Sequence, residues 1–373
     1  MVASVDHHFH SFHLPCIDML IKSGNIVDVA AKVTDGTSHI PGVKQQYDVP
    51  FERSPFKLSN IKIYRQLKRI IEENDYNIIH CHTPVASVLA RMAARKARKK
   101  GVKVIYTAHG FHFYKGAPLI NWLIYYPIER LCSYITDVLI TINQEDYERA
   151  RRKMKAKSIE YIPGVGIETQ KYTDCNIDKF TKRKELGLPI DAIILLSVGE
   201  LNKNKNHEII IRAVAELNRQ DLHYVIAGPG SLEKYLCELS DKLGVKSQIH
   251  ILGLRKDIPE LCKMADIFCF PSKREGLPVS LVEAMASGVP CVASDIRGCN
   301  DVLQNGTGGF LCDSQNISAF VEAFNTLIQN ADLCSKMSVY NKQAIQPFDL
   351  NSVISYTHKL YGLLLNHDTF NSA

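Results

Sequence analysis

Two carboxylates eight positions apart are the strongest chemical signal in the chain. Glu275 and Glu283 stand in a stretch that passes from a predicted strand through a glycine turn into a predicted helix. Free backbone amides at such a turn form an anion site, which the helix dipole strengthens. A carboxylate in front of an anion site suits hydroxyl groups, so the pattern predicts a ligand that joins a phosphate to polyhydroxylated material. The segment expected to face it is Gly276, Leu277, Pro278 and Val279.

A second strand-to-helix turn carries cations. Lys203 and Lys205 follow Gly199 in the turn that precedes a predicted helix starting at His207. An ammonium in this position can reach a diphosphate as a point charge, although a solvated loop lysine is the commoner case. A third turn, from Arg255 to Ile258, follows another predicted strand and lies at the same end of the predicted sheet. This turn could bind a nucleotide base, and a plain loop between a strand and a helix explains it equally well.

Histidines collect at the ends of predicted strands in the first half of the chain. His82 ends one strand, His109 and a following glycine lie at the lip of a predicted crevice, and four more histidines fall between residues 7 and 13. We considered a metal site, since imidazole is a common metal ligand. No acidic or sulfur ligand accompanies these histidines at metal spacing, and histidines at strand ends often bond the backbone. We therefore expect no metal, and expect His109 to meet a ligand.

These residues need parallel sheets to position them, and the sequence predicts two. Apolar runs of four to seven residues alternate with longer helical patterns, which is typical of repeated βα units. The motifs above follow predicted strands, at the edge where open α/β sheets bind ligands. The predicted strands cover 1–5, 26–33, 77–82, 103–108, 138–142, 159–162, 193–198, 223–227, 249–252, 267–271 and 290–293.

An interruption of this βα pattern divides the chain into two expected domains. Gly164 and the polar stretch to about Leu188 interrupt the pattern and resemble a linker. We therefore expect domains over 1–165 and 166–345, and a C-terminal helix over 346–373 that returns to the first domain. The predicted helices cover 15–22, 61–74, 84–100, 118–135, 207–218, 232–243, 258–264 and 279–287.

The helix predicted over 84–100 has start and stop signals. Thr83 suits the N-cap, Pro84 the first helical position, and Gly101 the end. Along this helix a basic residue recurs every four positions, which predicts one basic stripe on its surface. The stripe consists of Arg91, Arg95 and Lys99.

Composition limits the class of protein. The 373 residues are 46% hydrophobic and 23% charged, which excludes collagen-like and disordered chains. Eleven cysteines are scattered singly without C-x-x-C spacing, so neither a disulfide framework nor a zinc cluster of cysteines is indicated, and the expected setting is the reducing cytoplasm. No signal peptide and no apolar run of about 20 residues stands out. We expect a protein that is soluble or rests on a surface.

The charge is unevenly distributed. Residues 1–180 hold 26 Lys and Arg against 18 Asp and Glu, a net +8, while the rest of the chain holds 19 against 21, a net −2. A basic front half points to nucleic acid, a phospholipid surface or a phosphorylated substrate. The segment from Tyr114 to Tyr126 contains the only tryptophan among aliphatic residues and tyrosines. That mixture suits a membrane interface, and a buried helix is the alternative.

The E-x7-E pair lies in Pro271-Ser-x-Arg-Glu-Gly-Leu-Pro-x-Ser-x-x-Glu-Ala-Met-Ala-x-Gly-x-Pro290. This motif resembles that of the family 4 retaining glycosyltransferases of GT-B fold, in particular bacterial enzymes that build capsular and extracellular polysaccharide. The resemblance covers nearly the whole chain. Further matching segments are 79–84, 107–110, 162–166, 198–201 and 252–258.

The resemblance implies two Rossmann-like βα domains facing across a cleft, the first binding the acceptor and the second a nucleotide sugar. It implies that Glu275 contacts the donor sugar, Glu283 the ribose hydroxyls and Lys205 the diphosphate. The loop from Arg255 to Ile258 would hold the base, and His109 would approach the sugar from the acceptor side as the third member of a catalytic set with Glu275 and Lys205. The other donor-binding residues would be Gly199, Lys203, Gly276, Leu277, Pro278 and Val279.

The implied activity is a hexosyl transfer from a nucleotide sugar, with uridine as the base, to a glycan or undecaprenyl-linked acceptor. The enzyme would rest as a peripheral protein on the anionic inner face of the cell membrane, with no metal or other cofactor and no nucleic acid. Double displacement needs a carboxylate beside the anomeric carbon. The first domain marks no such residue, so we expect a front-face mechanism in which the departing diphosphate helps to deprotonate the acceptor hydroxyl.

Two departures from the family pattern keep alternatives open. Glu200 stands where many members have an arginine, and residues 6–13 are rich in histidine where many members have a glycine-rich loop. A donor-binding protein without activity, a nucleotide-sugar epimerase of the same architecture and a nucleic-acid-binding protein are the competing interpretations. An epimerase would change the donor without any acceptor, and a nucleic-acid binder would show steep salt dependence.

Overall fold

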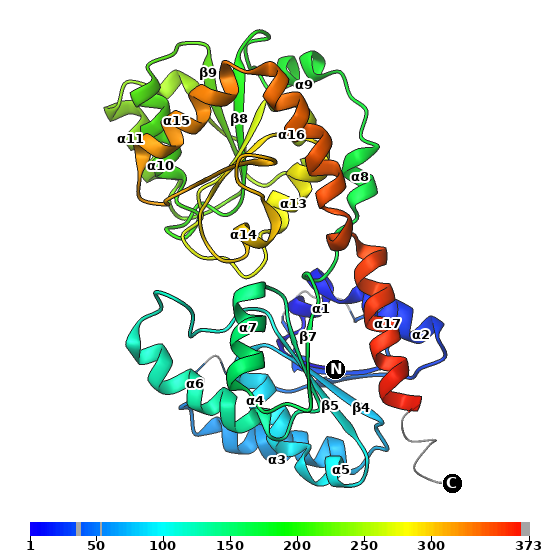
Figure 1. Cartoon of the computed structure of the whole chain (residues 1–373). Coiled ribbons are helices and arrows are strands. Elements are labelled where there is room, and N and C mark those ends of the chain that lie inside the picture. Colours follow the sequence, from blue (N-terminus) through cyan, green and yellow to red (C-terminus); the bar gives the residue numbers. More distant parts are fainter. Residues whose placement is uncertain (35–38, 53, 367–373) are drawn as a thin grey trace. The chain divides into compact units, whose positions relative to one another are not determined.

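The computed structural model describes residues 1–34, 39–52 and 54–366, and the chain divides into two compact units (Figure 1). The first unit combines Met1–Gly166 with the chain from Asn351 onward, and the second is Ile167–Leu350. The chain thus leaves the first unit after residue 166 and rejoins it after residue 350, one and five residues later than the boundaries expected from the sequence.

The first unit is built on a parallel sheet in the order β3-β2-β1-β4-β5-β6-β7. Connections run outward in opposite directions from the neighbours β1 and β4, so a crevice opens at the carboxyl ends of these two strands. The strands are β1 (Val2–Val5), β2 (Asp28–Lys32), β3 (Gln45–Asp48), β4 (Ile78–His82), β5 (Lys103–Ala108), β6 (Val138–Thr141) and β7 (Ser158–Tyr161).

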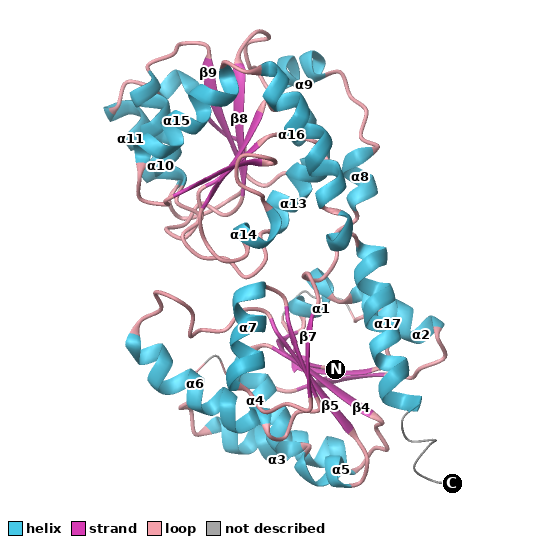
Figure 2. Cartoon of the chain, viewed as in Figure 1, coloured by secondary structure: helices cyan, strands magenta, loops and turns pink. Residues whose placement is uncertain are grey.

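Helices cover both faces of this sheet (Figure 2). One face carries α3 (Ser59–Glu72), α4 (Pro84–Ala93), α6 (Leu119–Ser133) and α7 (Gln144–Lys153), whose apolar sides share one core. The other carries α1 (His7–Phe12), α2 (Leu14–Lys22) and α17 (Leu350–Asn366). Val353, Leu360 and Tyr361 of α17 are buried in this second core, so the C-terminal helix is an integral layer of the first unit.

The second unit has a parallel sheet in the order β10-β9-β8-β11-β12-β13. Its order diverges at β8 and β11, which places a second crevice at their carboxyl ends. The strands are β8 (Ile193–Val198), β9 (Leu222–Ala227), β10 (Ile249–Ile251), β11 (Ile267–Phe270), β12 (Cys291–Ser294) and β13 (Gly309–Cys312).

Two cores enclose this sheet as well. One core includes residues of α10 (His207–Leu217), α11 (Glu233–Lys242) and α15 (Ile317–Ile328). The other includes residues of α8 (Thr169–Thr173), α12 (Ile258–Met264) and α13 (Val279–Ala286). The unit is completed by α9 (Lys179–Glu185), α14 (Cys299–Val302), α16 (Ala331–Ala344) and the 3₁₀ helices η1 (Lys246–Gln248) and η2 (Gln346–Phe348).

The segment expected to be a linker is structured. Residues 164–188 include α8 and α9, so the expectation of a long interdomain linker was wrong. The polar composition of this segment suggested a linker, but some of its charged residues are buried and contribute to the packing of the second unit. The guanidinium of Arg183, on α9, is buried and donates to the carbonyls of Met264 and Ala192 and to Asp266.

The helix predicted over 84–100 is broken at Ala94 into α4 and α5 (Arg95–Lys99). Thr83 precedes it with a positive φ of 61° and makes no side-chain cap. Its hydroxyl instead accepts a hydrogen bond from the amide of Ser4. Thr83 thus occupies the predicted N-cap position and Pro84 begins the helix, but the side-chain cap is missing because the Thr83 hydroxyl bonds Ser4 of β1 instead.

The predicted basic stripe does not exist as a surface. Arg91 is 1% exposed, its Nη2 donates to Glu129 Oε2 at 2.8 Å, and its guanidinium lies 4.1 Å from the centroid of the Tyr106 ring. Its partner lies 38 positions away, on α6, which sequence spacing could not reveal. Arg95 and Lys99 remain exposed.

All eleven cysteines, each within the described part of the chain, are free thiols. Among the described residues, no helix combines the length and the apolar character needed to cross a membrane.

Candidate active site

Two loops of the second unit meet at the crevice where its sheet order diverges. Gly199–Asn206 follows β8, and Pro271–Pro278 follows β11. Lys205 Nζ lies 2.8 Å from Glu275 Oε1 and 4.8 Å from the centroid of the Phe270 ring. Two residues that the sequence placed on separate turns therefore form an ion pair. Both side chains keep some solvent exposure, so a ligand can reach them.

The first of these loops fixes Lys205. The side-chain oxygen of Asn202 accepts from the amides of Asn204, at 3.0 Å, and Lys205, at 2.9 Å, which closes an Asx turn. The stem of Lys205 lies against Gly199, where an added Cβ would stand 3.3 Å from Lys205 Cδ and Cε. Asn206 adopts the left-handed conformation, with φ at 56°, and its side-chain Nδ2 donates to the carbonyl of Pro271. These contacts fix the position of the loop that carries the Lys205 ammonium.

The second loop is tied to the first. The amide of Lys273 donates to the Asn204 carbonyl at 2.8 Å, and the Asn204 side chain donates to the Arg274 carbonyl at 3.0 Å. The Ser280 hydroxyl donates to the Val198 carbonyl at 3.0 Å. These bonds hold Glu275 at a fixed distance from Lys205.

The turn before α13 offers the predicted backbone donors. The amides of Gly276 and Leu277 have no acceptor among the residues that the structure describes. Pro278 carries no amide hydrogen, and the amide of Val279 donates to the Leu277 carbonyl at 3.1 Å. Two amides beside the Lys205 ammonium are thus left for a ligand anion.

Glu283 lies farther along α13 and has a partner that the sequence did not indicate. The Tyr172 hydroxyl donates to Glu283 Oε1 at 2.5 Å. Burial raises the pKa of the Glu283 carboxyl, and the bond from Tyr172 acts in the opposite direction. Tyr172 belongs to α8, inside the segment taken for a linker, and no local pattern marked it.

The other predicted donor-binding residues lie around this pair in different ways. Lys203 is exposed and lines a separate cavity of about 360 Å³, together with His207, Tyr235 and Lys273. Arg255 forms a bidentate pair with Asp257, at 2.8 and 2.5 Å, which holds the pKa of that carboxyl well below its usual range. Ile258 begins α12 and packs against the core.

His109 lies in the first unit, directly after β5. It is half-buried and joins His8, His13 and His82, whose ring nitrogens lie within 4.8 Å of one another. Asp6 accepts from the amide of His7 and starts α1, so the residues expected to form a loop are helical.

Comparison with known proteins assigns the chain to a family. Residues 178–344 match the family described as glycosyl transferases group 1, and residues 2–143 match the family described as glycosyl transferase 4-like. EpsD of Bacillus subtilis strain 168, a protein named as a glycosyltransferase, is 39% identical over 371 residues, covering 98% of this chain and 97% of that protein. The chain belongs to the glycosyltransferases.

Other similar proteins agree with this assignment. An Escherichia coli enzyme named UDP-Gal:alpha-D-GlcNAc-diphosphoundecaprenol alpha-1,3-galactosyltransferase is 30% identical over 274 residues, covering 71% of this glycosyltransferase and 70% of that enzyme. The crystal structure of HepE from Anabaena in complex with UDP and glucose matches with a TM-score of 0.77, 19% identity and coverage of 97% and 99% of the two chains. At that identity the match establishes the fold, which is the expected GT-B class of two Rossmann-like units.

Glu200, the departure from the family pattern, has a local role in this glycosyltransferase. It is exposed, and its Oε2 accepts from the Asn202 side chain at 3.0 Å. Asn202 is the residue whose oxygen closes the turn around Lys205. Glu200 therefore supports the loop that presents the remaining cation.

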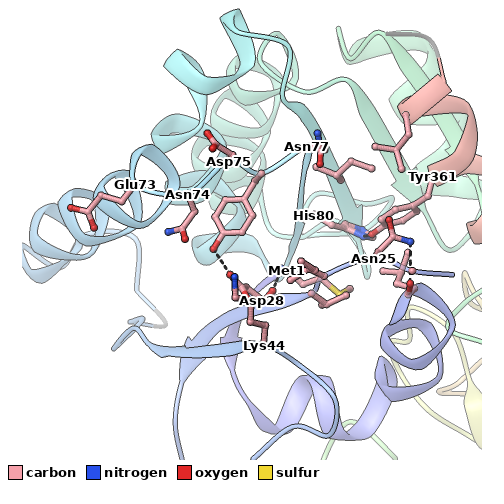
Figure 3. Close-up of a pocket in the computed structure, with 17 residues that line it drawn as sticks. Met1, Asn25, Asp28, Lys44, Glu73, Asn74, Asp75, Asn77, His80 and Tyr361 are labelled. Atoms are coloured by element: carbon pink, nitrogen blue, oxygen red, sulfur yellow. Dashed lines mark hydrogen bonds between the residues drawn. The ribbon is translucent and has the colours of Figure 1, made fainter. Parts of the chain in front are cut away.

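A cavity of about 620 Å³ lies at the opposite edge of the first sheet (Figure 3). Met1, Asp28 and Ile78, where β1, β2 and β4 begin, contribute to its lining. The Met1 ammonium donates to the Asp28 carbonyl, and the Tyr76 hydroxyl donates to Asp28 Oδ2 at 2.7 Å. Open parallel sheets bind ligands at the carboxyl ends of their strands, so the crevices, and not this cavity, are the candidate site.

The outer face of α6 carries several exposed apolar side chains, together with the exposed Arg130. Leu119, Leu123 and Leu131 recur at four- and eight-residue spacing and are 81%, 73% and 69% exposed. Trp122, which the sequence suggested for a membrane interface, packs against the core, with the Arg149 guanidinium 5.3 Å from its ring centroid. The exposed leucines, and not the tryptophan, form the outward apolar surface of this helix.

Proposed function

We propose that this glycosyltransferase is a retaining enzyme that moves a sugar from a UDP-sugar to a lipid-linked glycan acceptor, in the assembly of a bacterial cell-surface polysaccharide. The observation that carries the proposal is the Lys205–Glu275 pair beside the unpartnered amides of Gly276 and Leu277. The ammonium and the amides suit a diphosphate, and the carboxylate suits sugar hydroxyls. The Escherichia coli relative, named for a UDP-Gal donor and a diphosphoundecaprenol-linked acceptor, and the complex of HepE with UDP support the donor and acceptor classes.

The Lys205–Glu275 ion pair suggests how the transfer is catalysed. Without a donor, Lys205 is neutralised by Glu275. A bound diphosphate competes for the ammonium, and its demand grows as the sugar–phosphate bond breaks and charge develops on the leaving oxygen. That interaction is stronger in the transition state than in the ground state, which is the requirement for catalysis. Glu275 is then available to accept hydrogen bonds from the sugar.

Retention follows from a front-face path. The bond from the anomeric carbon to the diphosphate oxygen breaks, and the acceptor oxygen attacks on the same face. The acceptor proton passes to the departing diphosphate. Lys205, with the amides of Gly276 and Leu277, supplies the charge that Mg²⁺ supplies in many phosphate sites, so the proposal requires no metal at the diphosphate.

The acceptor class suggests a membrane surface. The leucines on the outer face of α6 form an apolar surface of the kind that marks membrane or protein contacts. The first 180 residues add a net charge of +8. We place the first unit on the inner face of the cell membrane through this helix. Arg91 has no part in this contact, because it is buried.

A donor panel tests the proposal. The protein is heated with each of several UDP-, GDP- and dTDP-sugars, and the expected result is protection by a UDP-sugar, since a ligand at a hundred times its Kd adds about 2.7 kcal/mol of stability. The protecting donor is then incubated with an undecaprenyl diphosphate-linked sugar, and the product is examined for transfer. Donor that is epimerised without acceptor, or protection by no nucleotide sugar, contradicts the proposal.

A further inference from the structure

Four histidines of the first unit converge at the crevice between its diverging strands. His8 lies on α1, His13 directly precedes α2, His82 is the last residue of β4, and His109 follows β5. Three separate parts of the chain thus contribute to one group, which we name the histidine cluster. One nitrogen from each ring lies within 4.8 Å of the others.

Two of the nitrogen–nitrogen distances in the cluster match those between ligands on one small ion. Two nitrogens bound to a tetrahedral Zn²⁺ at about 2.0–2.1 Å lie about 3.3–3.4 Å apart. His13 Nε2 and His8 Nε2 are 3.2 Å apart, and His82 Nδ1 and His109 Nε2 are 3.3 Å apart. The His13 and His82 rings overlap, with centroids 4.0 Å apart, which joins the two pairs into one group.

His82 differs from the neighbouring His80. Both ring nitrogens of His80 are bonded, Nδ1 to the Tyr361 hydroxyl at 2.5 Å and Nε2 to the Thr107 hydroxyl at 2.7 Å, so His80 is a satisfied structural histidine. His82 is 1% exposed, and its Nε2 is buried without a hydrogen bond among the described residues. Its Nδ1 faces His109 Nε2 and is the one nitrogen that this ring offers to an ion shared with the other three rings.

Imidazole binds a metal ion through a ring-nitrogen lone pair, and the four rings bring one nitrogen each within 4.8 Å of the others. A metal ion accepts several such lone pairs at once, which a hydrogen bond between two rings cannot do.

We propose that the histidine cluster is a binding site for one divalent transition-metal ion, with Zn²⁺ as its ion. Four imidazole nitrogens suit Zn²⁺, Cu²⁺ or Ni²⁺, whereas Mg²⁺ and Ca²⁺ require oxygen ligands. Four protein ligands close the coordination sphere, so the site is structural. The ion would clamp α1 and the start of α2 to the ends of β4 and β5, and would fix the orientation of His109 at the crevice. This site is separate from the diphosphate end of the donor, where we require no metal.

Zinc binding by the purified full chain tests the proposal directly. The protein is prepared without a metal-affinity tag, treated with chelator, dialysed and titrated with Zn²⁺ alone. We expect one equivalent bound and a higher Tm. Substitution with Co²⁺ is expected to give the intense visible absorption of a tetrahedral site, which is independent of catalytic activity. Failure to bind one equivalent, or a Co²⁺ spectrum typical of six-coordination, overturns the proposal.

Variants locate the ion. His8→Ala and His109→Ala remove half-buried ligands and are expected to fold, while weakening Zn²⁺ binding at least tenfold and removing the tetrahedral spectrum. The matched control is the double variant His223→Ala with His250→Ala, a bonded histidine pair of the second unit whose nitrogens lie 2.9 Å apart. That control is expected to bind Zn²⁺ like the unaltered protein. Binding that survives both cluster variants, or that is lost in the control, places the ion elsewhere and overturns the proposal.

Discussion

At the scale of single residues, Lys205 and Glu275 carry the greatest expected catalytic weight. Lys205→Ala and Glu275→Ala are each expected to lower kcat/KM for the donor by about two to three powers of ten, because each removes an interaction that strengthens as charge separates. Lys203→Ala is expected to lower kcat/KM much less, because Lys203 is exposed and lines a cavity to which neither Lys205 nor Glu275 contributes. Steady-state kinetics with the protecting UDP-sugar measure all three.

The two lysines also serve as controls for one another. If Lys205→Ala kept full activity while Lys203→Ala was inactive, Lys203 and not Lys205 would be the lysine that contacts the diphosphate. If both variants kept full activity, the diphosphate would bind at another part of the chain.

Tyr172 gives a prediction about pH. Burial raises the pKa of the Glu283 carboxyl, and the hydrogen bond from Tyr172 lowers it. Tyr172→Phe removes the lowering influence, so the carboxyl protonates at a higher pH and becomes a weaker acceptor for the ribose hydroxyls that the family resemblance assigns to it. The pH below which the donor KM rises is expected to move upward. A KM profile that is unchanged across the pH range would separate Glu283 from donor binding.

At the scale of elements, the pair between α4 and α6 predicts a large effect on stability. Arg91 and Glu129 are 1% and 8% exposed at their side chains and lie 2.8 Å apart. Arg91→Ala leaves a buried carboxylate without its partner, which typically costs about 3–5 kcal/mol. Denaturant unfolding of the variant measures the loss. Arg95→Ala, on exposed α5, is the control and is expected to change the free energy of unfolding by less than about 0.5 kcal/mol.

The sequence predicted elements well where burial and periodicity agree. β5, β8 and α12 have the bounds expected from their apolar patterns. β3 escaped prediction because its residues, Gln45–Asp48, form a half-exposed edge strand with little apolar character. α1 was taken for a loop because its histidines show no apolar period, although Asp6 caps it.

The site was predictable in its positions and not in its partnerships. The turns at Lys205 and Glu275 follow strands that the apolar runs revealed, so both residues could be placed at one sheet edge. Their direct ion pair, and the bond from Tyr172 to Glu283, join residues 70 and 111 positions apart. Which histidines converge likewise depends on strand order. Such contacts arise from tertiary packing, which no local pattern encodes.

At the scale of the whole molecule, the outer face of α6 predicts membrane binding. Leu119→Ser with Leu123→Ser is expected to reduce flotation with anionic vesicles several-fold, because it removes the most exposed apolar side chains of that helix. Binding of the unaltered protein is expected to weaken as salt rises. Val339→Ser, at an exposed position of the second unit, is the control and is expected to float normally. Equal binding to neutral and anionic vesicles, or none to either, would favour a soluble acceptor.

The complete reaction gives a further prediction. Addition of Mg²⁺ is expected to leave the transfer rate unchanged, because in the proposed mechanism Lys205 and the amides of Gly276 and Leu277 neutralise the diphosphate. The product is expected to keep the anomeric configuration of the donor, as measured by NMR. Stimulation by Mg²⁺ would contradict the first expectation, and an inverted anomeric signal would contradict the front-face path.

The return of α17 to the first unit has a consequence for synthesis on the ribosome. Translation delivers all of Ile167–Leu350 before the helix that contributes Val353, Leu360 and Tyr361 to the first core. The second unit can thus finish folding while the first unit still lacks α17. Among the contacts completed at that moment is the bond between His80 and Tyr361, 281 positions apart. A nascent chain halted after residue 350 would carry a finished second unit beside an unsealed first one.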